Sequence, residues 1–206
     1  MSLSHSPLIV RDGLVLCLDA ANPRSYPKSG TTWSDLAGAS NGTLTNGPTF
    51  DADNKGSIVF DGTDDRVDVS NLNSSLFTTG ATIFAFLKLA NATPSNQSKT
   101  GLWGFGSSSY RSHYPWTNGR AYMDTFRTSR IESITLSSSV DRTKPHSLCV
   151  TSKNSDMWRM YQNTQLVAEV SAQSSINLPC NTFGRSCVNA LYDDVYLEGA
   201  FYTFLM

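Results

Sequence analysis

The stretch from residue 13 to residue 68 alternates short apolar runs with dense turn signals, a pattern typical of a chain that folds into β-strands. Residues 14–18 read LVLCL and are apolar throughout, as in a strand buried on both faces. Residues 58–60 form a second apolar run, which ends at Asp61-Gly62, a dipeptide that favours positive φ at the glycine of a tight turn. Residues 66–69 then alternate polar and apolar side chains. We therefore predict a β-meander over this stretch.

The rest of the chain has strand and turn patterns of the same kind and no extended helical pattern. No stretch carries apolar residues at i, i+3, i+4 and i+7 over three turns. With 206 residues, of which 39% are hydrophobic, the chain is long enough to bury one sizeable core. We therefore predict an all-β protein with little helix, in which an N-terminal arm over residues 1–12 precedes one domain over residues 13–206.

A series of segments in the first third resembles a known family. Residues 13–20 read GLVLCLDA and are followed in order by Ser25-Tyr26-Pro27, Gly30, Trp33, Asp35-Leu36, Asn41-Gly42-Thr43-Leu44, Asn46-Gly47-Pro48-Thr49-Phe50 and Ile58-Val59-Phe60-Asp61-Gly62. This series resembles the opening of laminin-G-like, concanavalin A-like lectin-type domains in virion structural proteins of tailed phages. Later segments, at residues 82–89, 144–151, 158–163, 166–170, 183–184 and 191–197, are similar to the same domain's core and closing strands. The resemblance implies an antiparallel jelly-roll β-sandwich.

Two features of the second half bear on this expected fold. The family usually turns on an Asn-Gly pair where this chain has Asn163-Thr164-Gln165. Because a threonine is strained at positive φ, we expect a longer or different loop at this point. The last residues, 201–206, are mostly apolar, and we expect them to pack in the sandwich or on a partner.

The overall charge argues against a nucleic-acid partner. The formal net charge of -1 and the pI near 6.3 give no long-range positive field. Arg111, Arg120, Arg127 and Arg130 form a local basic cluster, for which a solvated strand face is the simpler interpretation. Residues 1–10 lack a signal-peptide core, and no run approaches the roughly 18 to 20 apolar residues that span a bilayer. We expect no membrane partner and synthesis in a cytoplasm.

The four cysteines fall into two contexts. Cys17 and Cys149 lie inside strand patterns, where free cysteine behaves as a small buried hydrophobe. Cys180 and Cys187 are close enough in sequence to cross-link a loop or hairpin, and neither has a Cys-x-x-Cys or paired histidine partner. Idle thiols are the simpler interpretation, and a disulfide between Cys180 and Cys187 stays open.

A glycoside hydrolase is one kind of protein that such a sandwich can form. A retaining hydrolase needs two carboxyl groups about 5 to 5.5 Å apart. The only glutamates are Glu132, Glu169 and Glu198, and none lies in a Glu-x-Asp-x-x-Glu pattern. No Gly-x-Ser-x-Gly elbow surrounds a serine either. We therefore predict no catalytic residues and a protein that is not an enzyme.

Calcium is the one cofactor that the sequence raises. Asp61, Asp64 and Asp65 cluster in one turn, and carboxylate oxygens at such spacing are ligands that calcium accepts. In the family that the chain resembles, the same residues form a turn that occurs without metal. We favour the structural turn and keep calcium as the alternative.

The densest set of recognition side chains lies at residues 110–122. Aromatic faces stack on sugars while polar side chains fix hydroxyls, and protein interfaces use the same anchors. Asn118-Gly119 predicts a hairpin turn that brings Trp116 and Tyr122 together. Interior packing is the alternative for Tyr122 and for Trp103, whereas we expect exposure of His113, Tyr114 and Trp116. The candidate residues that bind a glycan or a protein partner are His113, Tyr114, Trp116, Asn118, Arg120 and Tyr122.

The resemblance implies a structural role in a virion that is assembled in the host cytoplasm. We favour a capsid decoration or cement protein over a fibre, because the chain has no repeats or coiled-coil heptads. Such a protein would bind capsid or other virion proteins by contact, and its apolar ends predict a homo-oligomer, with a trimer suggested by the family. The alternative is a carbohydrate-binding module that adsorbs the virion to host glycans, and a glycoside hydrolase comes third.

Overall fold

The computed structural model describes residues 12–38, 40–72, 80–93, 101–105, 110–125, 129–133, 136, 138–153, 157–170, 181–186 and 196–206. The predicted arm, apart from Asp12, lies outside these residues, as do Cys180, Cys187 and Arg127. Within the described ranges the only helix is one 3₁₀ turn, Asp53–Lys55, and all other regular structure is β-strand. None of the helical structure in this part of the chain is long and apolar enough to cross a bilayer. The predicted all-β class is confirmed.

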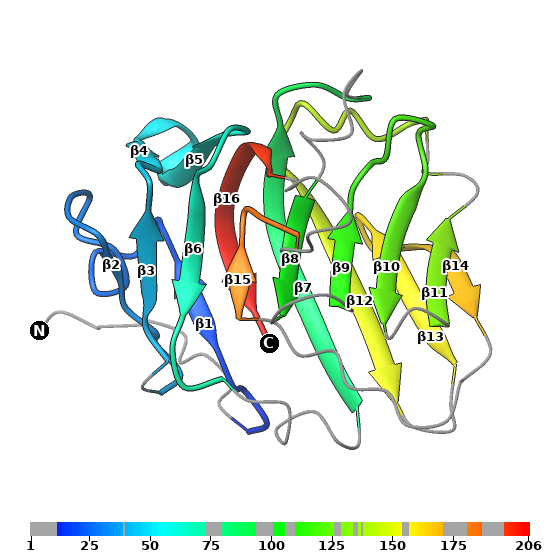
Figure 1. Cartoon of the computed structure of the whole chain (residues 1–206), viewed down its shortest axis with the longest axis horizontal. Helices are drawn as coiled ribbons and strands as arrows, with labels where there is room; N and C mark the ends of the chain where they lie inside the picture. Colours follow the sequence, from blue (N-terminus) through cyan, green and yellow to red (C-terminus); the bar gives the residue numbers. More distant parts are fainter. Residues whose placement is uncertain are drawn as a thin grey trace, which may run out of the picture.

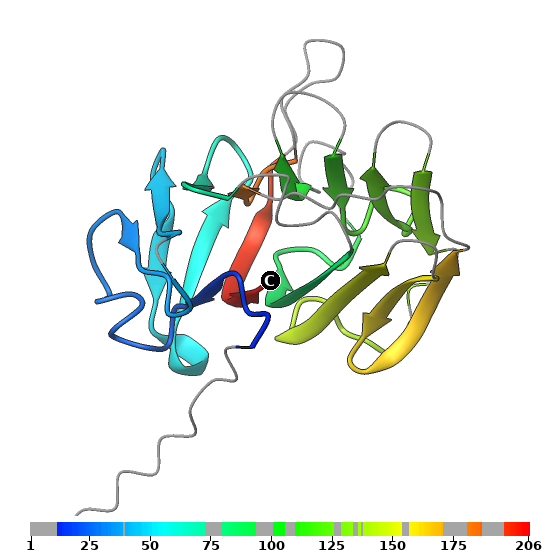
Figure 2. The same ribbon diagram turned by 90° about the horizontal axis from the view of Figure 1, so that it is seen from below.

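Two antiparallel sheets face each other, as Figures 1 and 2 show from two sides. The first sheet has the order β14-β13-β12-β7-β16-β5-β4, and β1 also pairs with β16. The second has the order β11-β10-β9-β8-β15-β6-β3-β2. This arrangement confirms the predicted antiparallel jelly-roll sandwich.

Each of the two sheets contains eight strands. The first sheet contains β1 (Cys17–Asp19), β4 (Thr49–Asp51), β5 (Ser57–Asp61), β7 (Gly80–Leu89), β12 (His146–Lys153), β13 (Trp158–Gln162), β14 (Gln165–Val170) and β16 (Glu198–Leu205). The second contains β2 (Thr32–Trp33), β3 (Gly42–Thr45), β6 (Arg66–Val69), β8 (Gly101–Phe105), β9 (Tyr110–His113), β10 (Ala121–Thr125), β11 (Ser129–Ser133) and β15 (Thr182–Phe183).

The predicted β-meander is wrong, because its strands belong to different sheets. β5 lies in the first sheet and β6 in the second, so the turn at Asp61-Gly62 carries the chain across the sandwich. Gly62 has φ of 74°, as the turn signal predicted. A hairpin and a crossing between sheets both need such a turn, and both leave apolar residues alternating along each strand. The local pattern therefore predicts the strands but not their pairing.

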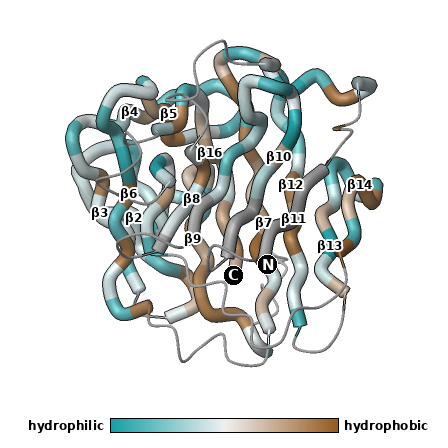
Figure 3. Tube along the Cα trace, turned by 45° about the vertical axis from the view of Figure 1, so that its right-hand side comes forward, coloured by the Kyte–Doolittle hydropathy of each residue, from teal (hydrophilic) through white to brown (hydrophobic). Residues whose placement is uncertain are grey.

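Aromatic rings from both sheets meet in the core around β16. The rings of Phe183 and Phe204 are 3.9 Å apart between centroids, and Trp103 packs edge-on against Phe204 at 5.9 Å. On the first sheet's own side, Phe60 meets Phe201 at 5.7 Å. Hydrophobic stretches also run along β7 and β12 (Figure 3).

The apolar C-terminal residues pack inside this chain's own sandwich. Phe201, Phe204 and Met206 are at least nine-tenths buried. The backbone of Met206 pairs with Leu16 in both directions, at 3.0 Å each. The first of the two expectations for residues 201–206, that they pack in the sandwich, is therefore correct.

The two cysteines that the structure describes agree with the prediction made for them. Cys17 in β1 is buried, and Cys149 in β12 is a half-buried free thiol. Burial raises the pKa of the Cys149 thiol, so the unreactive thiol form is favoured near neutral pH.

One buried carboxylate organises the loop between β2 and β3. Asp35 Oδ1 accepts hydrogen bonds from the backbone N–H groups of Cys17 at 2.8 Å and Ala37 at 2.9 Å. Its Oδ2 accepts from the N–H groups of Gly38 at 3.0 Å and Ser40 at 3.2 Å. This carboxylate joins the loop to β1 and thereby links the two sheets at one end.

We predict that Asp35→Asn lowers the free energy of unfolding by about 2 to 4 kcal/mol, because an amide turns an N–H₂ group toward backbone donors. Urea unfolding followed by tryptophan fluorescence measures the loss. Asp53→Asn, at an exposed position, is the matched control and should change stability by less than about 0.5 kcal/mol. Equal effects of the two substitutions would contradict this role for Asp35.

The turn between β13 and β14 differs from its prediction. Gln162 pairs directly with Gln165, so the loop contains only Asn163 and Thr164. Both have positive φ, 46° and 68°, as a two-residue primed turn requires. The Asn163 side chain accepts a hydrogen bond from the N–H of Ser147 at 2.9 Å, which ties the turn to β12. The prediction of a longer or different loop is therefore wrong. The strand pairing holds Thr164 in a strained conformation that its sequence preference disfavours.

Replacing Thr164 with glycine should therefore stabilise the protein by about 0.5 to 1 kcal/mol, since glycine adopts positive φ without the Cβ clash. Thr31→Gly is the control, because Thr31 is exposed and is not at positive φ, so glycine there should be neutral or destabilising. The thermal unfolding midpoint should rise for Thr164→Gly and should stay unchanged or fall for Thr31→Gly. A Thr164→Gly midpoint below that of the wild type would count against the assigned turn.

Candidate carbohydrate-binding site

The candidate residues lie on the hairpin that joins β9 to β10 at one end of the second sheet. Its strands pair with His113 opposite Tyr122. The Trp116 N–H donates to Arg120 O at 2.7 Å, and the Gly119 N–H donates to Trp116 O at 2.8 Å. Gly119 has φ of 77°, so the turn ends in the left-handed residue that Asn118-Gly119 predicted. The predicted hairpin is confirmed.

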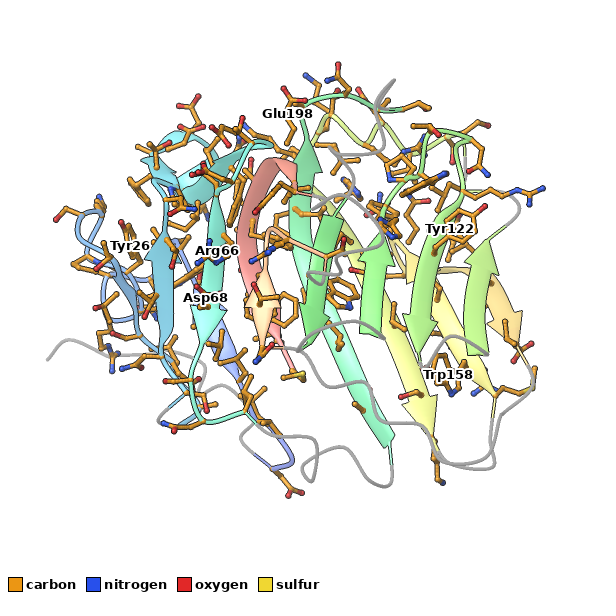
Figure 4. The ribbon with its side chains drawn as sticks, in the orientation of Figure 1. Tyr26, Arg66, Asp68, Tyr122, Trp158 and Glu198 are labelled. Carbon is orange, nitrogen blue, oxygen red and sulfur yellow. The ribbon has the colours of Figure 1, made fainter. Side chains whose placement is uncertain are left out.

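This hairpin gathers three rings and an amide. The Trp116 ring lies 6.3 Å from Tyr122 and 4.5 Å from His113 between centroids, edge-on to each. Asn118 Nδ2 donates to the Tyr122 hydroxyl at 2.8 Å, and Asn118 Oδ1 accepts from the Arg120 N–H at 3.1 Å. Trp116 and Tyr122 are partly exposed and Asn118 is exposed. Figure 4 labels Tyr122 on β10. The structure thus brings together the pair that the sequence predicted.

Tyr114 and His113 are not exposed, contrary to expectation. Tyr114 is 0% exposed and His113 is 6% exposed. The two-residue period of the strand turns Ser112 and Tyr114 inward. His113 is covered instead by the Trp116 ring. Trp103, for which interior packing was the alternative, is buried. Tyr114 therefore positions the hairpin and does not contact a ligand directly.

Two residues from distant parts of the chain anchor Tyr114, and a third holds one of them. Its hydroxyl accepts a hydrogen bond from Gln162 Nε2 at 2.6 Å and lies 2.9 Å from His146 Nε2. His146 Nδ1 lies 2.9 Å from the carbonyl oxygen of Lys144. A carbonyl only accepts, so Nδ1 carries the proton and Nε2 accepts from the Tyr114 O–H. One proton arrangement satisfies all three contacts.

The electrostatics agree with a neutral histidine and a neutral tyrosine. Burial lowers the pKa of His146, and the positive charge of Arg142 lowers it further, against the opposing effect of the hydrogen bond to Lys144. Burial raises the pKa of Tyr114 above its ordinary value. His146 begins β12, and no sequence signal indicated its contact with Tyr114.

The buried His146 predicts a pH dependence of stability. Because its pKa is lower in the folded protein than the ordinary value of about 6.5, the unfolded chain binds the proton more tightly. Stability should be complete above pH of about 6.5 and should fall as the pH drops toward the lower folded pKa. Urea unfolding between pH 5 and pH 7.5, compared with His146→Gln, measures this contribution. An unchanged slope in the variant would contradict a buried neutral His146.

The acidic turn brings its three carboxylates together. Ligand oxygens of Asp61, Asp64 and Asp65 all lie within 4.8 Å of one another. Asp65 Oδ2 accepts from the Asp61 N–H at 3.0 Å, and Asp61 Oδ1 accepts from the Thr63 N–H at 2.7 Å. Burial raises the pKa of Asp65, and the charges of Asp61 and Asp64 add to the rise. These hydrogen bonds fit the favoured structural turn, and the oxygen spacing also fits a cation, so calcium stays a prediction.

A second polar cluster lies on β6 and its neighbours. Arg66 Nε donates to both oxygens of Asp68, at 3.1 and 2.9 Å (Figure 4). Thr45 Oγ1 and Thr182 Oγ1 donate to the same carboxylate at 3.0 and 3.4 Å. Asp68 is half exposed, so this ion pair adds little to stability.

Two of the three glutamates are too far apart to act as a hydrolase pair. Glu169 lies on β14 and Glu198 on β16, with β13, β12 and β7 between them. Strands about 4.8 Å apart separate them by about 19 Å, whereas glycosidase acids lie about 5 to 9.5 Å apart. Glu169 Oε1 is also paired with Arg159 Nε at 2.8 Å. The side chain of Glu132 lies outside the described part of the structure.

No protein family pattern matches the sequence, and no curated protein is similar to it. Solved structures are similar in fold. The binding domain of botulinum neurotoxin serotype D has a TM-score of 0.65 at 11% identity, over 95% of this chain and 48% of that one. Domain 4 of AbnA, a GH43 extracellular arabinanase from Geobacillus stearothermophilus, in complex with arabinotriose, has a TM-score of 0.64 at 11% identity, over 93% of this chain and 91% of that one.

A third similar structure is the botulinum neurotoxin DC binding domain in complex with SialylT, with a TM-score of 0.64 at 13% identity, over 95% of this chain and 47% of that one. The chain spans about half the length of the neurotoxin binding domains that it matches. At these identities the likeness concerns the fold. The chain has the fold of lectin-like β-sandwich domains.

Proposed function

We propose that this chain is a carbohydrate-binding module whose binding surface is the β9–β10 hairpin. The observation that carries the proposal is the partly exposed pair of Trp116 and Tyr122, held beside the exposed amide of Asn118. A ring offers contact area to the C–H face of a sugar, and an adjacent amide offers hydrogen bonds to hydroxyls. Two structures with the same fold, the arabinanase domain with arabinotriose and the neurotoxin domain with SialylT, support this choice.

The candidate residues divide into two roles under this proposal. Trp116, Tyr122, Asn118 and Arg120 form the contact surface, on the turn and the start of β10. Tyr114 lies beneath them and fixes the hairpin to the first sheet through Gln162 and His146. Rings that are already held in place lose little conformational entropy when a ligand binds, which favours affinity.

The virion context remains part of the proposal through the sequence resemblance alone. The segments between residues 13 and 62 resemble domains of tailed-phage virion proteins, which favours a module that adsorbs a particle to host glycans. The cement role is the weaker candidate, because residues 201–206 pack in their own sandwich and leave the expected contact surface without its apolar end. The predicted homo-oligomer and trimer stay predictions.

Binding should depend on the exposed ring. Trp116→Ala is expected to weaken glycan binding by about 2 kcal/mol, roughly thirtyfold in Kd, since alanine cannot replace the stacking area. Tyr161→Ala, which removes a half-buried ring from β13 in the first sheet, is the control and should leave Kd unchanged. A glycan array that includes arabinotriose and 3′-sialyllactose, followed by calorimetry on the tightest ligand, provides the measurement.

Circular dichroism establishes that both variants are folded. Wild-type protein that binds no glycan on the array would defeat the proposed function. Binding that survives Trp116→Ala would place the site on another surface.

A further inference from the structure

An apolar row of side chains crosses five neighbouring strands on the outer face of the first sheet. Phe84, Cys149 and Tyr161 alternate with buried residues of their own strands, so their side chains point away from the core. Residues that pair directly in adjacent strands share a face of the sheet. The row, which we call the outer stripe, consists of Leu205 of β16, Phe84 of β7, Cys149 of β12, Tyr161 of β13 and Leu166 of β14.

Apolar side chains are not the usual occupants of these positions. In an antiparallel sheet with one solvated face, the outward positions are typically polar. Leu166 is nevertheless 49% exposed, and the other four members of the outer stripe are partly exposed. Apolar surface that continues from strand to strand marks a place where another molecule binds. The outer stripe is therefore a candidate contact surface.

The residues beside the outer stripe on β7, β12, β13 and β14 add no excess of charge. Arg159 Nε donates to Glu169 Oε1 at 2.8 Å, so these two charges offset each other. Like charges that face each other oppose the association of two identical surfaces. The remaining residues directly beside the stripe on β7 and β12 are neutral, namely Phe86, Ser147, Thr82 and Thr151. Two copies of this face can therefore approach without like-charge repulsion.

The face is also large enough for a dimer. Five strands at a spacing of about 4.8 Å are about 24 Å wide, and the eight residues of β12 extend about 27 Å. The flat area is then about 650 Å² for one copy, so two facing copies would bury about 1,300 Å² in total. Stable and specific protein interfaces bury about 1,200 to 2,000 Å².

We propose that two copies of this chain form a dimer in which the outer stripes of their first sheets pack against each other. The inference goes beyond the proposed glycan site and does not rest on it. Facing sheets lie about 10 Å apart with their side chains interdigitated, a distance that the rings of Phe84 and Tyr161 can fill. A twofold axis brings the same surface together from both copies and closes the assembly at two.

Such a dimer leaves the proposed glycan surface uncovered. The outer stripe belongs to the first sheet, whereas the β9–β10 hairpin belongs to the second. Figure 2 shows strands β12 to β14 (yellow) in one layer and β9 to β11 (green) in the other. The Kd for a soluble glycan should therefore be the same in the dimer and in the monomer.

Sedimentation of the full chain over a concentration series up to about 100 μM tests the proposal. We expect a species with twice the mass of one chain. Leu166→Arg places a charge in the outer stripe and should weaken the dimer at least about tenfold in Kd. Thr43→Arg adds the same charge at an exposed position of β3 in the second sheet, and this control should leave the dimer intact.

Four results would overturn the inference. They are a wild-type chain that stays monomeric, a wild-type trimer, a dimer that survives Leu166→Arg, and a dimer that is lost in Thr43→Arg. Calorimetry with a soluble glycan separates this inference from the proposed function, because the Leu166→Arg monomer should bind with the Kd of the wild type. A wild-type dimer that binds no glycan would defeat the proposed function alone.

A measurement on the wild type covers the case in which Leu166→Arg fails to fold. Cys149 is a half-buried free thiol in the middle of the outer stripe, where the second copy would cover it. Its labelling by excess N-ethylmaleimide, followed by peptide mass spectrometry, should slow severalfold over the concentration range in which sedimentation shows the dimer to form. Cys17, which is buried, should stay unlabelled throughout. A Cys149 labelling rate that does not change as the dimer forms would place the interface on another surface and overturn the inference.

Discussion

The contact between the two sheets around β16 is the interaction on which the rest of the structure depends. Phe204 on β16 meets Phe183 and Trp103 of the second sheet, while Phe201 meets Phe60 within the first. Burying rings of this size supplies the main favourable free energy of a sandwich with little helix. The β16 strand therefore holds both sheets together.

The proposed site depends on this packing through a single buried hydroxyl. Tyr114 extends from the second sheet and reaches Gln162 and His146 of the first, so the hairpin is fixed to both layers. The apolar core sets the distance between the sheets, and the polar contact sets where the hairpin lies between them. Trp116 and Tyr122 then stay at the surface in a defined arrangement, which suits recognition better than a mobile loop would.

Local signals in the sequence predicted the features that depend on neighbouring residues. They include the positive φ of Gly62 and the hairpin turn at Gly119. The strands at residues 82–89 and 158–163 were expected from the family resemblance. The pairing of β5 and β6 with different sheets could not be predicted, because a hairpin and a crossing have the same local pattern. Thr164 shows the opposite case, in which strand pairing overrides the preference of a residue.

The anchor beneath the site was missed for a related reason. Tyr114 and Gln162 are 48 residues apart, and neither has a neighbour in sequence that indicates the contact. The inward position of Tyr114 could have been inferred from its two-residue spacing from Ser112, since side chains alternate along a strand.

The central claim is that glycans bind on the β9–β10 hairpin, and a nitrogen–proton NMR titration with the tightest glycan from the array tests it most directly. The account predicts that the largest shifts occur at the Trp116 indole N–H and the Asn118 side-chain amide. The indole signals of the buried Trp103 and Trp158 should move little. Shifts centred on another surface, such as the Arg66–Asp68 cluster of the second sheet, would contradict the account.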